Sequence, residues 1–192
     1  MLSKNKKLMV CLNGCGGVGK DELVEFCRNE AYSKDTYIAN LSTIDLIRQA
    51  GHLLGCVDKE ENDRKFLSDL KHLSKEYNNH PRNYIKNQIK SFCNLTGNTI
   101  IFVHSREIEE IKEFKEYFIE HGIVDYFISV LVKNKNVEKI VSNESDAGVE
   151  DYEYDYYIHN DEGLDELRDT AKTFINDIIN VYFTEDVKRK VS

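Results

Sequence analysis

The residues with the clearest chemical meaning lie near the start of the chain, in the run Gly14-Cys15-Gly16-Gly17-Val18-Gly19-Lys20. This run fits the pattern G-x-x-x-x-G-K. Glycines let successive backbone N–H groups turn toward one anion, and the terminal lysine can reach β- and γ-phosphate oxygens. The alternative is a glycine-rich turn with a surface lysine. We expect a phosphate-binding loop for ATP, and the predicted nucleotide-binding residues are Gly14, Gly16, Gly17, Val18, Gly19, Lys20, Asp21 and Glu22.

Asp21 stands where the general pattern has a serine or threonine that coordinates magnesium. A carboxylate at this position would repel ATP unless Mg²⁺ or Lys20 lies between the two groups. Two interpretations remain open: Asp21 is an alternative Mg²⁺ ligand, or it is an acid in the first turn of a helix that faces solvent.

Gly14-x-x-Gly17-x-Gly19-Lys20-x-Glu22 resembles the G-x-x-G-x-G-K-x-T loop of nucleoside monophosphate kinases, the family that includes adenylate kinase. The Gly-Lys-Asp sequence is similar to the loops of phage-type deoxynucleoside monophosphate kinases and of animal-type phosphomevalonate kinase. Glu22 occupies the position of the family's threonine. The resemblance implies a P-loop NTPase fold and transfer of phosphate from ATP to a small monophosphate.

A second segment, Leu41-Ser42-Thr43-Ile44-Asp45-Leu46-Ile47-Arg48, looks like the S-T-G-D-x-x-R segment that opens the substrate-binding region of adenylate kinases. By this resemblance Thr43 and Arg48 contact the acceptor monophosphate. Read by itself, the segment has Ser42 and Asp45 at the spacing of a helix-capping box, and the alternative is a capped helix with a solvated arginine.

A third match, Phe102-Val103-His104-Ser105-Arg106-Glu107, lies at the end of a predicted strand, where these kinases carry an acid and then an arginine that binds the acceptor phosphate. Arg106 matches the arginine, and a guanidinium binds phosphate with two parallel hydrogen bonds. His104 replaces the acid, and it is either a strand-end histidine or a base.

The segment Asp155 to Gly163 resembles the strand, turn and final helix near the adenine in this group, which implies that Asn160 binds nucleotide; a plain turn is the alternative. The polar stretch from 133 to 154 is expected to be lid-like. It contains no arginine. Its lysines could replace the lid arginines of nucleotide kinases, and its polar residues could help to hold metal or substrate; the alternative is that all of them are solvated loop residues. These residues are Lys133, Lys135, Lys139, Asn143, Ser145 and Asp146. Arg64 and Arg82, in the helical middle of the chain, are further candidates for contacting the phosphates.

The elements that must position these residues alternate along the chain. Short apolar runs predict five strands, at 7–13, 35–41, 99–103, 126–132 and 155–159. Helical patterns lie between and after them, including an apolar stripe of Phe66, Leu70, Leu73 and Tyr77. We expect one α/β domain over residues 1–192, with a parallel sheet of about five strands covered by helices on both faces, and a helical insertion at about 42–95.

Composition narrows the partners. The net charge of −8 disfavours nucleic acid and anionic membranes, and no apolar run approaches the roughly 20 residues that span a bilayer. Five scattered cysteines without a C-x-x-C pair argue against disulfides and zinc, and Cys15 alone lies in the glycine loop. We therefore expect a cytoplasmic protein that acts on a small molecule.

Together these features predict an ATP-dependent phosphotransferase that requires Mg²⁺ and acts on a small monophosphate, with a (deoxy)nucleoside monophosphate as the first choice. Its predicted catalytic residues are Lys20, Arg48 and Arg106. The alternative is a regulatory protein that binds ATP at the same loop without kinase activity, because Glu22, His104 and the arginine-free lid depart from the kinase pattern.

Overall fold

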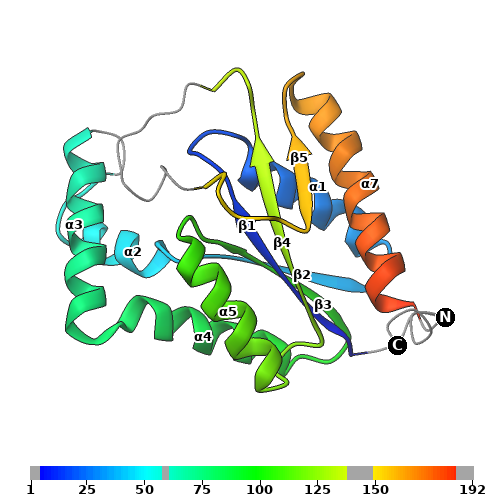
Figure 1. Ribbon diagram of the computed structural model, residues 1–192, viewed down its shortest axis with the longest axis horizontal. Coiled ribbons are helices and arrows are strands. Elements are labelled where there is room, and N and C mark those ends of the chain that lie inside the picture. The colour runs from blue at the N-terminus through cyan, green and yellow to red at the C-terminus, as the bar shows by residue number, and fades with distance from the viewer. Residues whose placement is uncertain (1–4, 58–60, 138–148, 185–192) are drawn as a thin grey trace. The chain divides into compact units, whose positions relative to one another are not determined.

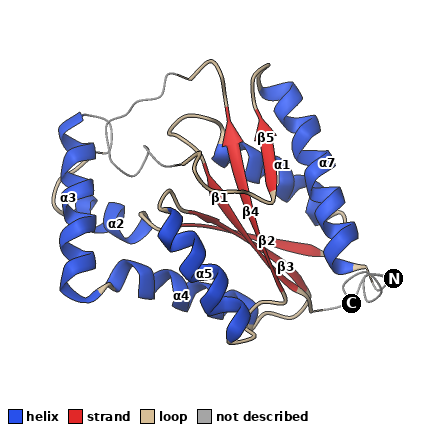
Figure 2. Ribbon diagram, viewed as in Figure 1, coloured by secondary structure: helices blue, strands red, loops and turns tan. Residues whose placement is uncertain are grey.

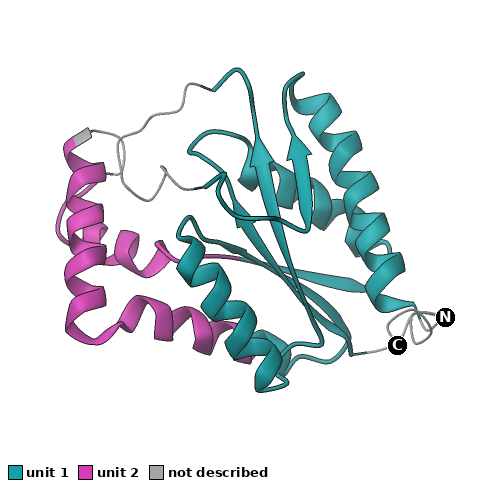
Figure 3. Ribbon diagram, in the orientation of Figure 1, with its two compact units in different colours: residues 1–40, 92–192 teal, residues 41–91 magenta. Residues whose placement is uncertain are grey.

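The computed structural model describes residues 5–57, 61–137 and 149–184. The chain divides into two compact units (Figure 3): the first contains residues 1–40 and 92–192, and the second contains residues 41–91. The second unit overlaps the predicted helical insertion.

A five-stranded parallel sheet forms the centre of the first unit (Figures 1 and 2), with the strand order β2-β3-β1-β4-β5. The central strand pairs with two neighbours, so that Val10 lies opposite Phe102 on one side and Ile128 on the other. The strands are β1 (Lys7–Asn13), β2 (Thr36–Ser42), β3 (Asn98–His104), β4 (Tyr126–Lys133) and β5 (Tyr156–His159).

Side chains alternate between the two faces of the sheet, as the period of a strand requires. Leu8, Val10 and Leu12 of β1 point into the larger core, which contains buried residues of α1 (Lys20–Tyr32) and α7 (Leu164–Phe183). Cys11 points the other way, and on that face it packs with Ile111 of α5 (Ile108–Glu120) and with the segment from Val149 to Tyr154. Helices therefore cover both faces, as predicted.

The predicted strands agree with the observed ones within a residue or two, because each is a short apolar run that stops at polar or glycine residues. The part of the predicted lid at 138–148 lies outside the described residues, and so do Lys139, Asn143, Ser145 and Asp146.

The second unit is helical and contains α2 (Asp45–Leu53), α3 (Glu61–Asn78) and most of α4 (His80–Cys93). One prediction is wrong here. Among the residues of α3 whose burial is described, Leu67 is the buried one, and it packs with Ile47 and Cys56 and against Leu70. Three members of the predicted stripe are exposed instead: Phe66, Leu73 and Tyr77.

Candidate functional site

The glycine run forms the loop between β1 and α1, at the carboxyl edge of the sheet. Two glycines are required by their surroundings. Gly14 has a φ of 136°, and a Cβ there would lie 2.4 Å from the Val132 carbonyl oxygen of the neighbouring strand. Gly19 has a φ of 93°, and its Cβ would lie 2.5 Å from the Asn160 side-chain nitrogen. The loop backbone is thus held tightly by β4 and by Asn160.

Lys20 is the first residue of α1, and its ammonium folds back over the loop. Its Nζ donates 2.7 Å hydrogen bonds to the carbonyls of Gly14 and Cys15. Gly19, as the N-cap, offers no side chain to the first N–H groups of the helix. A cation beside the positive end of a helix dipole is the arrangement that attracts phosphate.

Asp21 and Glu22 are exposed acids in the first turn of α1. Their position satisfies the preference of a helix N-terminus for negative charge. The carboxylate of Asp21 also supplies the kind of oxygen ligand that Mg²⁺ prefers, and it lies beside Lys20, the residue predicted to contact phosphate. The chemistry of Asp21 therefore fits the metal, although within the described residues no three His, Cys, Asp or Glu side chains gather into one metal cluster.

Arg106 follows the carboxyl end of β3, and its guanidinium lies beside the loop. A Cβ built on Gly16 would be 3.4 Å from the Arg106 Nη2 atom. The structure thus places two of the three predicted catalytic cations, Lys20 and Arg106, at one glycine loop.

His104, the last residue of β3, lies near both the loop and β2. Its Nε2 atom is 2.8 Å from the Asn40 side-chain oxygen and 3.7 Å from a carboxylate oxygen of Asp21. The imidazole is 12% exposed, whereas the Asp21 side chain is 84% exposed. Asn40 was not among the predicted site residues, because it lies in a predicted strand just before the Leu41–Arg48 segment and is not part of that motif.

Asn160 lies behind the loop, at the end of β5. It is 8% exposed, and its side-chain nitrogen donates a 3.0 Å hydrogen bond to the Val18 carbonyl. Its side-chain oxygen is buried and has no hydrogen-bond partner in the described part of the chain. Through this contact Asn160 braces the loop against β5.

Asn13 anchors the beginning of the loop and was also missed from the sequence. Its side-chain oxygen accepts a 2.7 Å hydrogen bond from the Gly14 N–H, and its nitrogen donates to the Tyr154 hydroxyl at 2.7 Å and to the Arg106 carbonyl at 3.4 Å. The Tyr154 hydroxyl in turn donates to the Val149 carbonyl at 2.9 Å. Burial raises the pKa of the Tyr154 hydroxyl well above its usual value, so the phenol stays protonated.

The predicted acceptor-binding residues Thr43 and Arg48 belong to the second unit. Thr43 is buried and Arg48 is exposed near the start of α2. The capping box is half formed: Asp45 accepts a 2.7 Å hydrogen bond from the Ser42 N–H, and the Ser42 hydroxyl accepts from Ile44 at 3.4 Å. Arg64 on α3 and Arg82 on α4 lie in the same unit.

Two of the lid lysines fall within the described residues, and each has a carboxylate partner. Lys133 lies 3.7 Å from Glu150, and Lys135 lies 3.9 Å from Asp161. Asp161 also accepts a 2.7 Å hydrogen bond from the Lys135 N–H. These contacts tie the end of β4 to the segments on either side of β5.

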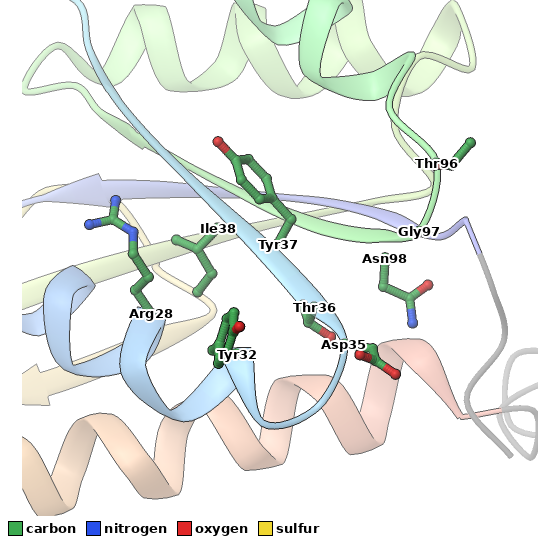
Figure 4. Close-up of a pocket in the computed structure, with 9 residues that line it drawn as sticks. All are labelled: Arg28, Tyr32, Asp35, Thr36, Tyr37, Ile38, Thr96, Gly97 and Asn98. Carbon is green, nitrogen blue, oxygen red and sulfur yellow. The ribbon is translucent and has the colours of Figure 1, made fainter.

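A separate pocket of about 750 Å³ lies in the first unit (Figure 4). It is lined by Arg28 and Tyr32 of α1, by residues 35–38 at the start of β2, and by residues 96–98 before and at the start of β3. Because the strands are parallel, this pocket lies at the amino edge of the sheet and is distinct from the glycine loop.

All five cysteines are free thiols: Cys11, Cys15, Cys27, Cys56 and Cys93. Cys11, Cys27 and Cys56 are buried, and burial raises the pKa of Cys27 to about 12. Cys15 is half-buried in the loop. No helix in the described ranges has the length and apolar character needed to cross a membrane.

Comparison with known proteins shows similarity at the level of three-dimensional structure. No protein-family model and no curated protein sequence matches the chain. A solved structure designated APE1195 is 14% identical, with 91% of this chain and 98% of the other covered and a TM-score of 0.50.

Two kinases give lower scores. The APS kinase of Mycobacterium tuberculosis in complex with AMPPNP and APS is 13% identical, over 90% of this chain and 98% of the kinase, with a TM-score of 0.48. A sugar kinase from Janibacter sp. HTCC2649 is 14% identical, over 93% and 99%, with a TM-score of 0.43. At these identities the comparisons concern the fold and not the adenylate kinase-like family in particular. The parallel sheet, the helices on both faces and the glycine loop after β1 identify the chain as an α/β protein with a P-loop NTPase fold.

Proposed function

We propose that this protein transfers the γ-phosphate of ATP to a small monophosphate acceptor, with a (deoxy)nucleoside monophosphate as the first choice. The observation that carries the proposal is the position of Arg106, whose guanidinium lies against Gly16 of the loop that Lys20 closes. Phosphoryl transfer depends mainly on positioning and on neutralising charge, so two cations at one phosphate-binding loop supply what the reaction needs.

In this proposal the loop amides and Lys20 hold the β- and γ-phosphates. ATP binding replaces the hydrogen bonds from Lys20 to Gly14 and Cys15 with bonds to phosphate oxygens. Asp21 is the residue that would hold Mg²⁺, which neutralises charge on the phosphates. Asn160 keeps Val18 and Gly19 in place, beside the predicted position of the adenine.

The acceptor half of the proposal assigns Arg106, Thr43 and Arg48 to the monophosphate. An oxygen of the acceptor phosphate attacks the γ-phosphorus in line, the bond from phosphorus to the β,γ-bridging oxygen breaks, and ADP leaves with that electron pair. A phosphate monoester is already ionised at neutral pH, because its second pKa is about 6. This acceptor needs no general base, which agrees with a histidine in place of the family's acid.

The test is to incubate the protein with ATP, Mg²⁺ and single acceptors, and to follow ADP. The panel comprises nucleoside and deoxynucleoside monophosphates, phosphomevalonate and dephospho-coenzyme A. Arg106→Ala should lower kcat/KM by about 100- to 1,000-fold, the usual loss when one transition-state donor is removed. Arg28→Ala, at the distant pocket of the first unit, is the matched control and should leave the rate unchanged.

Tight ATP binding without acceptor-dependent ADP from any member of the panel would contradict the transferase and favour the regulatory alternative. Equal activity of Arg106→Ala and the wild type would contradict the role of Arg106 but not the proposed reaction.

A further inference from the structure

Three polar side chains from three elements converge beside the loop. Asp21 comes from the first turn of α1, Asn40 from β2, and His104 from the end of β3. The Nε2 atom of His104 is the centre of the group, 2.8 Å from the Asn40 oxygen and 3.7 Å from the Asp21 oxygen. All three residues belong to the first unit.

The spacing of these atoms suits shared coordination of a metal ion. In an octahedral site with ligands about 2.1 Å from the metal, neighbouring ligand atoms lie about 3 Å apart. The distance of 2.8 Å from His104 Nε2 to the Asn40 side-chain oxygen is already close to this value. The distance to Asp21 must shorten by less than 1 Å, and the Asp21 side chain is 84% exposed and can turn toward the ring.

We propose that Asp21, Asn40 and His104 form a divalent-cation site with one nitrogen ligand, and that the site therefore binds first-row transition-metal ions such as Co²⁺ or Mn²⁺ more tightly than Mg²⁺. An imidazole nitrogen is a softer ligand than a carboxylate or amide oxygen, and it selects transition metals over magnesium. The asparagine oxygen accepts from Nε2 in the metal-free protein. When the proton of the ring moves to Nδ1, this hydrogen bond is lost, and the lone pair of Nε2 becomes available to bind the metal ion.

This inference rests on the proposed binding of ATP, because the cation would lie between the three side chains and the nucleotide phosphates. It goes further in naming His104 and Asn40 as metal ligands and in reversing the expected preference for Mg²⁺. A transferase with these ligands would work best with a transition-metal ion.

The experiment reads out coordination directly. Mn²⁺ is added to the full chain with the β,γ-methylene analogue of ATP, which has no bridging nitrogen, and electron spin echo modulation detects nitrogen bonded to the ion. We expect an imidazole ¹⁴N signal that changes to ¹⁵N when the histidines are labelled. His104→Gln should abolish the signal, and His159→Gln, an exposed histidine at the end of β5, should retain it.

Affinity gives a second readout. Titration of Co²⁺ and Mg²⁺ should show tighter binding of Co²⁺ to the wild type. His104→Gln removes a direct ligand and should weaken Co²⁺ binding by at least about 10- to 100-fold, the range already seen when only a partner of a ligand is changed. His104→Asp replaces the nitrogen with oxygen, so it should bind Mg²⁺ at least as well as the wild type and give no nitrogen signal. Thermal unfolding of both variants confirms that they are folded.

The outcomes separate this inference from the function on which it rests. Binding of the analogue and Mn²⁺ without a histidine nitrogen signal would overturn the site and leave the proposed function intact. Failure to bind the analogue, with His104-dependent binding of Co²⁺ alone, would overturn the function and leave the site. Failure of both analogue and metal to bind would overturn both.

Discussion

The side-chain amide of Asn13 donates a 2.7 Å hydrogen bond to the hydroxyl of Tyr154, 141 residues further along the chain. The side-chain oxygen of Asn13 accepts a hydrogen bond from the N–H of Gly14, the first residue of the glycine loop, and the Tyr154 hydroxyl donates one to the carbonyl of Val149. The hydroxyl of Tyr154 thus links the glycine loop to the segment that precedes β5.

Tyr154→Phe removes this hydroxyl and keeps the ring. Two buried partners, the amide of Asn13 and the carbonyl of Val149, then lose a hydrogen bond, so we expect a loss of about 1–3 kcal/mol in the free energy of unfolding. ATP affinity should also fall, because Asn13 no longer has a fixed orientation. Urea unfolding and calorimetric titration measure the two effects. Tyr32→Phe, at a highly exposed tyrosine, is the control, and an equal effect there would contradict the role of the hydroxyl.

The backbone at Gly19 offers a test of loop packing. Gly19 and Gly97 have nearly the same φ, 93° and 94°, but a Cβ at Gly19 meets Asn160 at 2.5 Å, whereas a Cβ at Gly97 has nothing within 4 Å. Both alanine variants should lose about 1–2 kcal/mol of stability from backbone strain.

Gly19→Ala should in addition weaken ATP binding by about tenfold or more, the equivalent of ~1.4 kcal/mol. Asn160→Ala combined with Gly19→Ala should recover part of this loss by removing the clash. The idea that Asn160 braces the loop is wrong if Gly97→Ala and Gly19→Ala bind ATP equally well.

Lys7 is a buried lysine at the opposite end of β1, and its role is structural. Its Nζ donates to the carbonyls of Leu95 and Gly97 at 2.6 and 2.8 Å and to the Thr99 hydroxyl at 2.9 Å. Burial lowers the pKa of this ammonium.

Lys7→Met leaves these three acceptors without their donor, and we expect a loss of about 2–4 kcal/mol, since hydrogen bonds to charged groups are the stronger ones. ATP affinity of the folded variant should not change, because Lys7 lies at the amino edge of the sheet. Lys172→Met, at an exposed position of α7, should change stability by no more than about 0.5 kcal/mol. A strong loss of ATP binding with unchanged stability would contradict this assignment.

The thiols should differ in reactivity. Cys15 and Cys93 are the half-buried ones, but burial raises the pKa of Cys93 to about 11, which leaves only about 0.1% thiolate at pH 8. We therefore expect N-ethylmaleimide to modify Cys15 first, and ATP to slow this modification because Cys15 lies in the loop. Mass spectrometry of digested protein identifies the modified residue. Modification of Cys93 before Cys15, or no protection by ATP, would contradict the prediction.

The local parts of this structure were predictable from the sequence. Apolar runs such as Lys7–Asn13 are buried strands, and the spacing from Gly14 to Lys20 specifies a tight loop at the start of a helix. Arg106 was predicted from the resemblance of its segment to the kinases, and it lies at the loop because the carboxyl ends of parallel strands meet at one edge of the sheet.

The long-range parts were not predictable. Asn13 and Asn40 carry no motif, and their partners Tyr154 and His104 are distant in sequence. In α3 the apolar residues Phe66 and Leu67 are adjacent, so helical spacing allowed either to face inward, and packing against Ile47 and Cys56 selected Leu67. Which residue faces inward is decided by tertiary contacts, and the helical spacing of apolar residues in the sequence does not reveal these contacts.

Lys20 and the glycine loop are proposed to bind the phosphates of ATP, and calorimetric titration of ATP with Mg²⁺ measures this binding. Lys115→Ala, at an exposed position of α5, serves as the matched control. We predict that Lys20→Ala weakens ATP binding by about 100-fold or more, which is ~2.7 kcal/mol, while Lys115→Ala binds as the wild type does. Retained ATP affinity in a folded Lys20→Ala variant would contradict the account.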